Sequence, residues 1–132
     1  MLIDTSGWFC IFDSADKQHT QAFSYYASSF ERITHSYVLA EFVALADARK
    51  RHRPAMLEFI SKLLADSEVS LIWVDELLTL RAIELLKGRS DKIWSLCDAV
   101  SFVIMDERRI SDAPTSDHDF EQAGFIQLLT SR

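Results

Sequence analysis

Glycine and proline are rare in this chain, and their scarcity limits the folds open to it. Three glycines and two prolines occur in 132 residues, whereas average composition supplies about 12% of the two together. A sandwich or barrel of many short strands needs a tight turn every few residues, and such turns favour these two residue types. The sequence therefore favours long helices joined by few tight turns.

Short apolar segments alternate with longer segments of helical periodicity. The expected strands are residues 1–3, 33–35, 69–74, 110–115 and 125–129. The expected helices cover about 17–30, 37–49, 54–64, 75–88, 95–105 and 119–123. Strands that alternate with helices form right-handed crossovers and a mainly parallel sheet. The sequence thus predicts an α/β fold whose central sheet is flanked by helices on both faces.

Three local patterns make more specific predictions. The polar residues 4–7 are predicted to form a turn after the first strand. Ser36 is predicted to cap the helix that follows it. In the helix over 17–30, an aromatic stripe at helical spacing is predicted to face the core. Its members are Phe23, Tyr26, Ala27 and Phe30.

The chain has the length of one domain, and no linker or repeat divides it, so we expect a single domain over residues 1–132. Its longest strictly apolar runs, such as 42–46, are far shorter than the roughly 18 residues of a membrane span. Without a basic leader at its start, the chain is expected to be cytoplasmic, with no membrane partner. Cys10 and Cys97 lack metal-binding spacing and are expected to be reduced, buried thiols.

A formal net charge of −6 argues against a nucleic-acid partner, because phosphates are bound by lysine and arginine. The argument weakens if several acids are gathered at one metal site, since they would account for most of that charge. A basic run is present at Arg49, Lys50, Arg51 and Arg53. It is either a solvated helix end, where cations are favoured, or an RNA contact, and the sequence leaves both open.

Four acids occupy positions that point to chemistry. Ligands of open α/β sheets bind at the carboxyl ends of strands, where Asp4 and Asp117 are expected, although either could be an ordinary turn residue. Glu41 and Asp98 instead lie on apolar helical rows, where an unpaired carboxylate is costly. A divalent cation would relieve the repulsion between such acids, and an all-oxygen site suits Mg²⁺ or Mn²⁺.

Four segments, taken in order and spacing, resemble the PIN-domain ribonucleases, especially bacterial toxins of the VapC type. They are LIDTS (2–6), YVLAEF (37–42), WSLCDAVSFVIM (94–105) and TSDHDFEQAGF (115–125). The resemblance covers nearly the whole chain. It implies a three-layer fold around a parallel sheet of strand order 3-2-1-4-5. It also implies cleavage of single-stranded or looped RNA with Mg²⁺ or Mn²⁺, leaving 3′-hydroxyl and 5′-phosphate ends.

The resemblance also assigns residues to this activity. The catalytic and metal-binding acids correspond to Asp4, Glu41, Asp98 and Asp117, with Asp119 as a neighbouring acid of variable role. The hydroxyls that line the same pocket correspond to Thr5, Ser6 and Thr115. Pro114 departs from the family, which usually has an aliphatic residue there. Because proline cannot donate to a strand ladder, the fourth strand must be short or kinked.

A VapC-type toxin implies two protein partners, a cognate antitoxin and a second copy in a homodimer. The apolar helices around 57–64 and 77–86 would offer the antitoxin a groove. Two other functions stay open. One is a catalytically silent PIN-like module that binds a protein or RNA. The other is a phosphotransfer domain with Asp4 as nucleophile, although that class generally has a second acid where this chain has Ser6.

Overall fold

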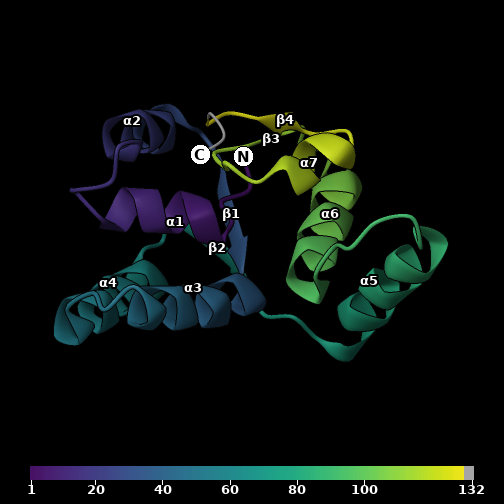
Figure 1. The fold of residues 1–132 in the computed structure, drawn as a ribbon, viewed down its shortest axis with the longest axis horizontal. Coiled ribbons are helices and arrows are strands. Elements are labelled where there is room, and N and C mark those ends of the chain that lie inside the picture. Colours follow the sequence, from purple (N-terminus) through teal and green to yellow (C-terminus); the bar gives the residue numbers. More distant parts are fainter. Residues whose placement is uncertain (130–132) are drawn as a thin grey trace.

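Short parallel strands lie between two groups of helices in the computed structural model, which describes residues 1–129 (Figure 1). The helices are α1 (Thr5–Phe12), α2 (His19–Ser28), α3 (Ser36–Ala48), α4 (Arg53–Ala65), α5 (Glu76–Gly88), α6 (Leu96–Arg108) and α7 (His118–Gln122). The strands are β1 (Arg32–His35), β2 (Val69–Ile72), β3 (Asp112–Ala113) and β4 (Ile126–Gln127). The predicted α/β class is confirmed; the last three residues of the predicted domain, 130–132, lie outside the described residues.

The strands form two parallel pairs, β1 with β2 and β3 with β4. Residues 1–3 connect the pairs. Leu2 forms an isolated parallel bridge with Ile33, and its N–H donates to the carbonyl of Asp112 at 3.3 Å. The strand predicted over residues 1–3 is therefore only a bridge, because the chain turns into α1 directly afterwards. The five-strand order stays a prediction.

Two hydrophobic cores lie on opposite sides of this first segment. Leu2 packs into the core between the strands and α5 to α7, whereas Ile3 packs into the core formed mainly by α1, α3 and α4. Side chains of adjacent residues in an extended chain point to opposite faces. The two groups of helices in Figure 1 thus cover opposite faces of the strands, as predicted.

The turn predicted over residues 4–7 is wrong. Asp4 is instead the N-cap of α1, and its Oδ1 accepts the N–H of Gly7 at 2.9 Å. A short polar side chain followed by small residues satisfies the signature of a turn and that of a helix N-cap equally well. The apolar residues that follow decide the outcome, because α1 buries Trp8 and Phe9 in the core.

The aromatic stripe predicted to face the core also needs correction. Phe23 is 51% exposed, Phe30 lies beyond the end of α2 and is fully exposed, and Ala27 is exposed as well. Ala22 is the buried residue of α2, while half-buried Tyr26 packs edge-on against Trp8. Helix α2 lies at the periphery of its group, where α1 is its main neighbour, so part of its apolar spacing stays uncovered (Figure 1).

The starts of several helices agree with the sequence-based predictions, and one predicted cap does not. Asp75 and Ser95 cap α5 and α6 at the predicted starts of these helices, and Pro54 lies in the first turn of α4. Ser36, however, is not a cap. His35 takes that position, and the Ser36 hydroxyl instead accepts the N–H of Val74 at 2.9 Å. No helix within residues 1–129 has both the length and the apolar character to cross a bilayer.

The expected interruption at Pro114 is confirmed. Strand β3 ends at Ala113, and the N–H of Thr115 donates to the Ala113 carbonyl at 2.8 Å, which makes a three-residue turn centred on Pro114. The Pro114 carbonyl faces Gly7, where an added Cβ would lie only 2.5 Å from its oxygen. Glycine at this position therefore lets the first turn of α1 lie against the loop that leads to Asp117.

We expect Gly7→Ala to destabilise the protein by about 1–3 kcal/mol, because backbone must move to admit the methyl group. Gly88→Ala is the matched control: nothing lies within 4 Å of its added Cβ, and alanine is the better helix former. This control should leave the free energy of unfolding unchanged or raise it by less than about 1 kcal/mol. Urea denaturation measures both, and equal stability of Gly7→Ala and the parent would contradict the close contact.

Candidate metal centre and active site

Asp4 is buried at the start of α1 and is surrounded by donors. Its Oδ2 accepts the Thr115 hydroxyl at 2.7 Å, its Oδ1 accepts the Gly7 N–H, and the Ser6 hydroxyl contacts both oxygens at 3.1 and 3.2 Å. Burial nevertheless raises the pKa of Asp4 to about 6, although these hydrogen bonds act in the opposite direction. The carboxylate therefore lies in an environment that favours neutralisation of its charge.

Thr115 connects Asp4 to the second part of the site. Its Oγ1 donates to Asp4 and accepts the N–H of Asp117 at 3.0 Å. Asp117 in turn caps α7, where its Oδ1 accepts the N–H of Asp119 at 2.9 Å. The turn at Pro114 thus delivers Asp117 to the site and does not displace it.

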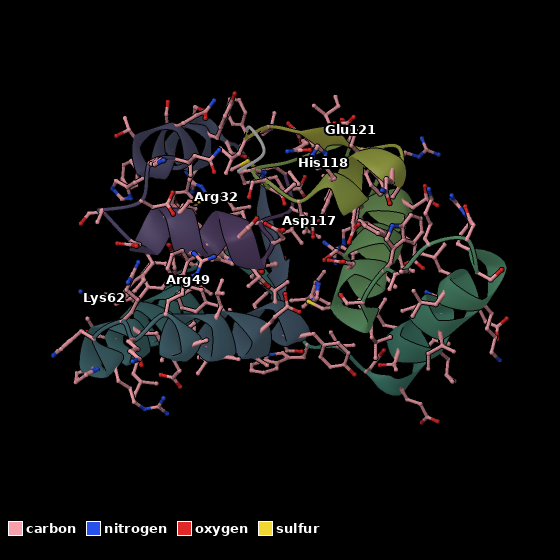
Figure 2. All side chains as sticks on the ribbon, viewed as in Figure 1. Arg32, Arg49, Lys62, Asp117, His118 and Glu121 are labelled. Carbon is pink, nitrogen blue, oxygen red and sulfur yellow. The ribbon has the colours of Figure 1, made fainter. Side chains whose placement is uncertain are left out.

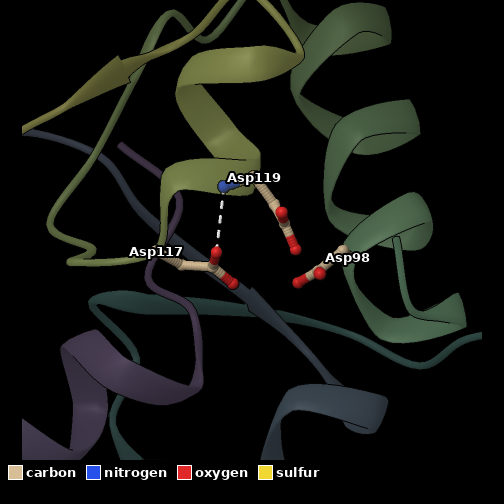
Figure 3. Close-up of side chains that lie close together, drawn as sticks. All are labelled: Asp98, Asp117 and Asp119. Atoms are coloured by element: carbon tan, nitrogen blue, oxygen red, sulfur yellow. Dashed lines mark hydrogen bonds between the residues drawn. The ribbon is translucent and has the colours of Figure 1, made fainter. Parts of the chain in front are cut away.

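Three carboxylates converge most closely, those of Asp98, Asp117 and Asp119 (Figure 3). Each offers one oxygen, and these oxygens lie within 4.8 Å of one another. Asp98 extends from the first turn of α6, which Ser95 caps, while the other two belong to the start of α7. Burial, followed by the charge of Asp117, raises the pKa of Asp98 to about 8, and burial also raises the pKa of Asp117.

Glu41 and Cys97 border this group. The charge of Glu41 contributes to the raised pKa of Asp117, so this exposed side chain of α3 faces the cluster. Burial, followed by the charges of Glu41 and Asp98, raises the pKa of the Cys97 thiol. Cys10 is buried as expected, whereas Cys97 is only partly buried and faces the acids.

The arrangement fits a divalent cation. All candidate ligands in the closest group are carboxylate oxygens, which hard cations such as Mg²⁺ and Mn²⁺ prefer. Their mutual repulsion, which appears in the raised pKa values, is the interaction that a cation would relieve. The closest group differs from the expected set, because it includes Asp119 and leaves Asp4 and Glu41 at its border.

The hydroxyls expected to line the pocket have different surroundings. Ser6 and Thr115 belong to the hydrogen-bond network around Asp4, and their side-chain oxygens lie 3.1 Å apart. The Oγ1 of Thr5 is buried and has no hydrogen-bond partner among the described residues. Only Ser6 and Thr115 therefore act directly on a site carboxylate.

The structure separates the four basic residues predicted to contact RNA. Arg51 forms an ion pair with Asp13 at 2.8 Å, and Arg53 forms one with Asp47. Within the described part of the chain, Arg49 and Lys50 have no such acidic partner. Two of the four cations are therefore already engaged by the protein itself.

The closest acidic group offers only carboxylate oxygens in an α/β fold of short parallel strands, the fold class whose ligands bind at the ends of strands. Residues 1–126 match the PIN domain family, and the chain belongs to that family. The chain is 30% identical over 129 residues to the 23S rRNA-specific endonuclease VapC20 of Mycobacterium tuberculosis, from strains CDC 1551 / Oshkosh and ATCC 25618 / H37Rv, with 97% of both chains covered.

Two solved structures resemble the fold. The crystal structure of Mycobacterium tuberculosis VapC20, described as a Sarcin-Ricin loop cleaving toxin, matches with a TM-score of 0.85 and 31% identity over 96% of each chain. A toxin-antitoxin complex from Klebsiella pneumoniae matches with a TM-score of 0.66 and 15% identity over 98% of each chain. The first match agrees with the family assignment in sequence and structure, and the second shows the shared fold.

In the metal-free protein, we expect stability to fall as pH rises from about 6.5 to about 8. The pKa of Asp98 is 3.8 in its ordinary state and about 8 in the folded protein, so between these values the folded state binds more protons and loses stability with rising pH. Burial lowers the pKa of His35 from 6.5 to about 4, which gives the opposite slope. This slope fades above pH 6.5, because the imidazole of the unfolded chain loses its proton there, and the Asp98 effect then dominates.

Thermal melts in EDTA at pH 6.5 and 8 test this expectation. Asp98→Asn should lose most of the pH dependence and should be at least as stable as the parent at pH 8, whereas Asp106→Asn, an exposed acid on the same helix, should retain the parental slope. Saturating Mg²⁺ should raise the melting temperature of the parent much more than that of Asp98→Asn. Equal slopes in the parent and Asp98→Asn would mean that the site assignment is wrong.

Proposed function

We propose that this protein is a divalent-metal-dependent endoribonuclease of the VapC toxin type. The observation that carries the proposal is the convergence of Asp98, Asp117 and Asp119, with Asp4 and Glu41 at the border of the group. Membership of the PIN domain family supports it, as does the similarity to a relative named as an endonuclease.

Hydrolysis of a phosphodiester needs an activated water, in-line attack and neutralisation of charge on the phosphoryl oxygens. A bound Mg²⁺ or Mn²⁺ supplies the activation and the neutralisation. In our proposal, Asp98, Asp117 and Asp119 hold the cation. Asp4 adds its charge from the buried side, and the Thr115 and Ser6 hydroxyls fix its orientation. In-line attack by water with the 3′ oxygen as leaving group would leave 3′-hydroxyl and 5′-phosphate ends.

The two alternatives find less support. A phosphotransfer domain would need a free nucleophilic carboxylate at Asp4, yet both of its oxygens accept hydrogen bonds, from Gly7, Ser6 and Thr115. A catalytically silent module has no use for the closely spaced carboxylates. No observation among the described residues favours either alternative.

We propose ribosomal RNA of the large subunit as the substrate. The relative that is 30% identical over nearly its whole length is named for 23S rRNA, and the similar crystal structure is described as cleaving the Sarcin-Ricin loop. The resemblance implies single-stranded or looped RNA in general, and 23S rRNA is the defined target within that class to test first.

We also propose a cognate antitoxin as partner. An apolar groove of about 220 Å³ lies between α1, α2 and α4, and Phe23, Tyr26 and Phe59 are among its lining residues. The expectation that α4 and α5 together offer the antitoxin a groove is wrong, because they belong to the two helix groups on opposite faces of the strands (Figure 1). Each has exposed leucines of its own, Leu57 and Leu64 on α4 and Leu77 and Leu80 on α5. The homodimer, the cytoplasmic location and the single domain remain predictions.

The protein should cleave 23S rRNA in purified ribosomes when Mg²⁺ or Mn²⁺ is present, and excess EDTA should abolish the cleavage. Removing one ligand charge should weaken both cation binding and transition-state stabilisation. We therefore expect Asp98→Asn and Asp117→Asn to lower the cleavage rate by at least about 100-fold. Primer extension over the rRNA measures the rate and locates the cut.

Asp106→Asn is the matched control for this assay, because its carboxylate lies on α6 but is exposed and outside the acidic group. It should cleave at the parental rate. Undiminished cleavage in EDTA would contradict the metal-dependent mechanism. A folded parent that cleaves no RNA with either metal would favour the silent module.

A further inference from the structure

A small hollow lies beside Ser6, whose hydroxyl contacts the Asp4 carboxylate. Its volume is about 60 Å³, and its lining residues are Ser6, Phe9, Leu45, Arg49 and Ser116. The first two are one turn apart on α1, and Leu45 and Arg49 are one turn apart at the end of α3, so the hollow lies between facing sides of these helices. It holds only a few water molecules and is too small for a nucleobase.

Ser6 connects the hollow to the metal centre. Its hydroxyl contacts both oxygens of Asp4 and also accepts the N–H of Ser116 at 3.3 Å. Ser116 directly precedes Asp117, whose carboxylate belongs to the acidic group. A group bound in the hollow is therefore separated from Asp4 by the side chain of Ser6 alone.

Arg49 differs from the basic residues that follow it. Arg51 donates from Nε and Nη2 to the Asp13 carboxylate at 3.1 and 2.8 Å, and Arg53 is paired with Asp47. The guanidinium of Arg49 lies 4.4 Å from the centre of the Phe9 ring, over which Arg51 also lies at 5.4 Å, but unlike Arg51 it has no carboxylate partner among residues 1–129. Figure 2 shows Arg49 between α1 and α3. The Phe9 ring holds the Arg49 guanidinium in place, and the N–H groups of the guanidinium stay available as donors.

The charge pattern defines the ligand that such a hollow takes. An RNA that approaches the carboxylates is repelled by them, so a cation close to the centre is needed to retain it. A guanidinium presents paired donors that match two phosphate oxygens, and Ser116 lines the same hollow. Because RNA carries a phosphate at every nucleotide, one phosphate can occupy the hollow while another lies at the metal centre.

We propose that Arg49 and Ser116 bind a non-scissile backbone phosphate of the RNA in this hollow, next to the phosphate that is cleaved. The inference rests on the proposed nuclease function and names a part of its substrate site. It assigns substrate binding to Arg49 and leaves Arg51 and Arg53 as structural ion pairs. Arg49 should therefore affect capture of the RNA and leave cation binding unchanged.

A phosphate scan tests the proposal. The substrate is a short RNA oligonucleotide spanning the mapped cut, in which each non-scissile phosphate in turn is replaced by a neutral methylphosphonate. For the parent, one position near the cut should lower kcat/KM by about 10- to 100-fold, as expected for loss of one charged hydrogen-bonded contact. Arg49→Gln should show the same loss on unmodified RNA and no further loss when that position is modified.

Control variants separate this contact from general charge. Arg53→Gln should keep the parental scan and kcat/KM, since Arg53 is engaged by Asp47. Arg49→Lys should be intermediate, because it keeps the charge and loses the paired donors. Arg49→Gln should also reduce the slope of log KM against log salt by about one. Ser116→Ala gives a second test, with a loss confined to the same phosphate.

The outcomes distinguish the two proposals. Suppose that the parent cleaves RNA. An Arg49→Gln variant with the parental kcat/KM, or with an unchanged methylphosphonate scan, would then overturn the proposed phosphate contact and leave the proposed function standing. A parent that cleaves no RNA would overturn the proposed function and this inference with it. In thermal melts, Mg²⁺ should stabilise Arg49→Gln as much as it stabilises the parent. If Mg²⁺ no longer stabilises this variant, Arg49 belongs to the metal centre and the phosphate contact is wrong.

Discussion

Repulsion between carboxylates is the constraint around which this protein is organised. Asp98, Asp117 and Asp119 come from two helices, and burial, followed by the charge of Asp117, raises the pKa of Asp98 to about 8. The fold opposes that repulsion with hydrogen bonds that join distant parts of the chain. Thr115 binds Asp4 and Asp117 together, and the carbonyl of Pro114 lies against Gly7, where only a glycine allows it. A divalent cation would replace the remaining repulsion by attraction, which couples function to stability.

The parts of the fold that could be predicted from the sequence are those with a long, one-sided apolar pattern or an unambiguous cap. Helices α3 to α6 and strands β1 and β2 are of this kind. Helix α1 was missed because its first residues satisfy both a turn and an N-cap, and only tertiary packing of Trp8 distinguishes the two. The prediction that the aromatic stripe on α2 faces the core was wrong for a related reason. Periodicity shows that apolar residues share a face, but it does not show whether a neighbouring element covers that face.

Asp98 was predictable because an unpaired carboxylate on an apolar helical row has no structural use, and Asp4 and Asp117 because they were expected at strand ends. The same helical argument was wrong for the surroundings of Glu41, whose side chain is exposed. Which of the acids lie closest was not predictable, because that depends on how α7 begins. The cap made by Asp117 brings Asp119 into the closest group, and no spacing rule contains that information. The arrangement of the basic run, residues 49–53, was not predictable either. Its composition suggested one surface, whereas the ion pairs of Arg51 and Arg53 separate them from Arg49.

The central claim, that Asp98, Asp117 and Asp119 hold a divalent cation, is tested most directly by anomalous diffraction from crystals of the protein grown with Mn²⁺. We expect one strong anomalous peak within about 2.2 Å of a carboxylate oxygen from each of the three residues. Crystals of Asp98→Asn grown in the same way should lose or weaken that peak, whereas crystals of Asp106→Asn should retain it. A peak held by other residues, or fully occupied Mn²⁺ in Asp98→Asn, would contradict the assignment of this centre.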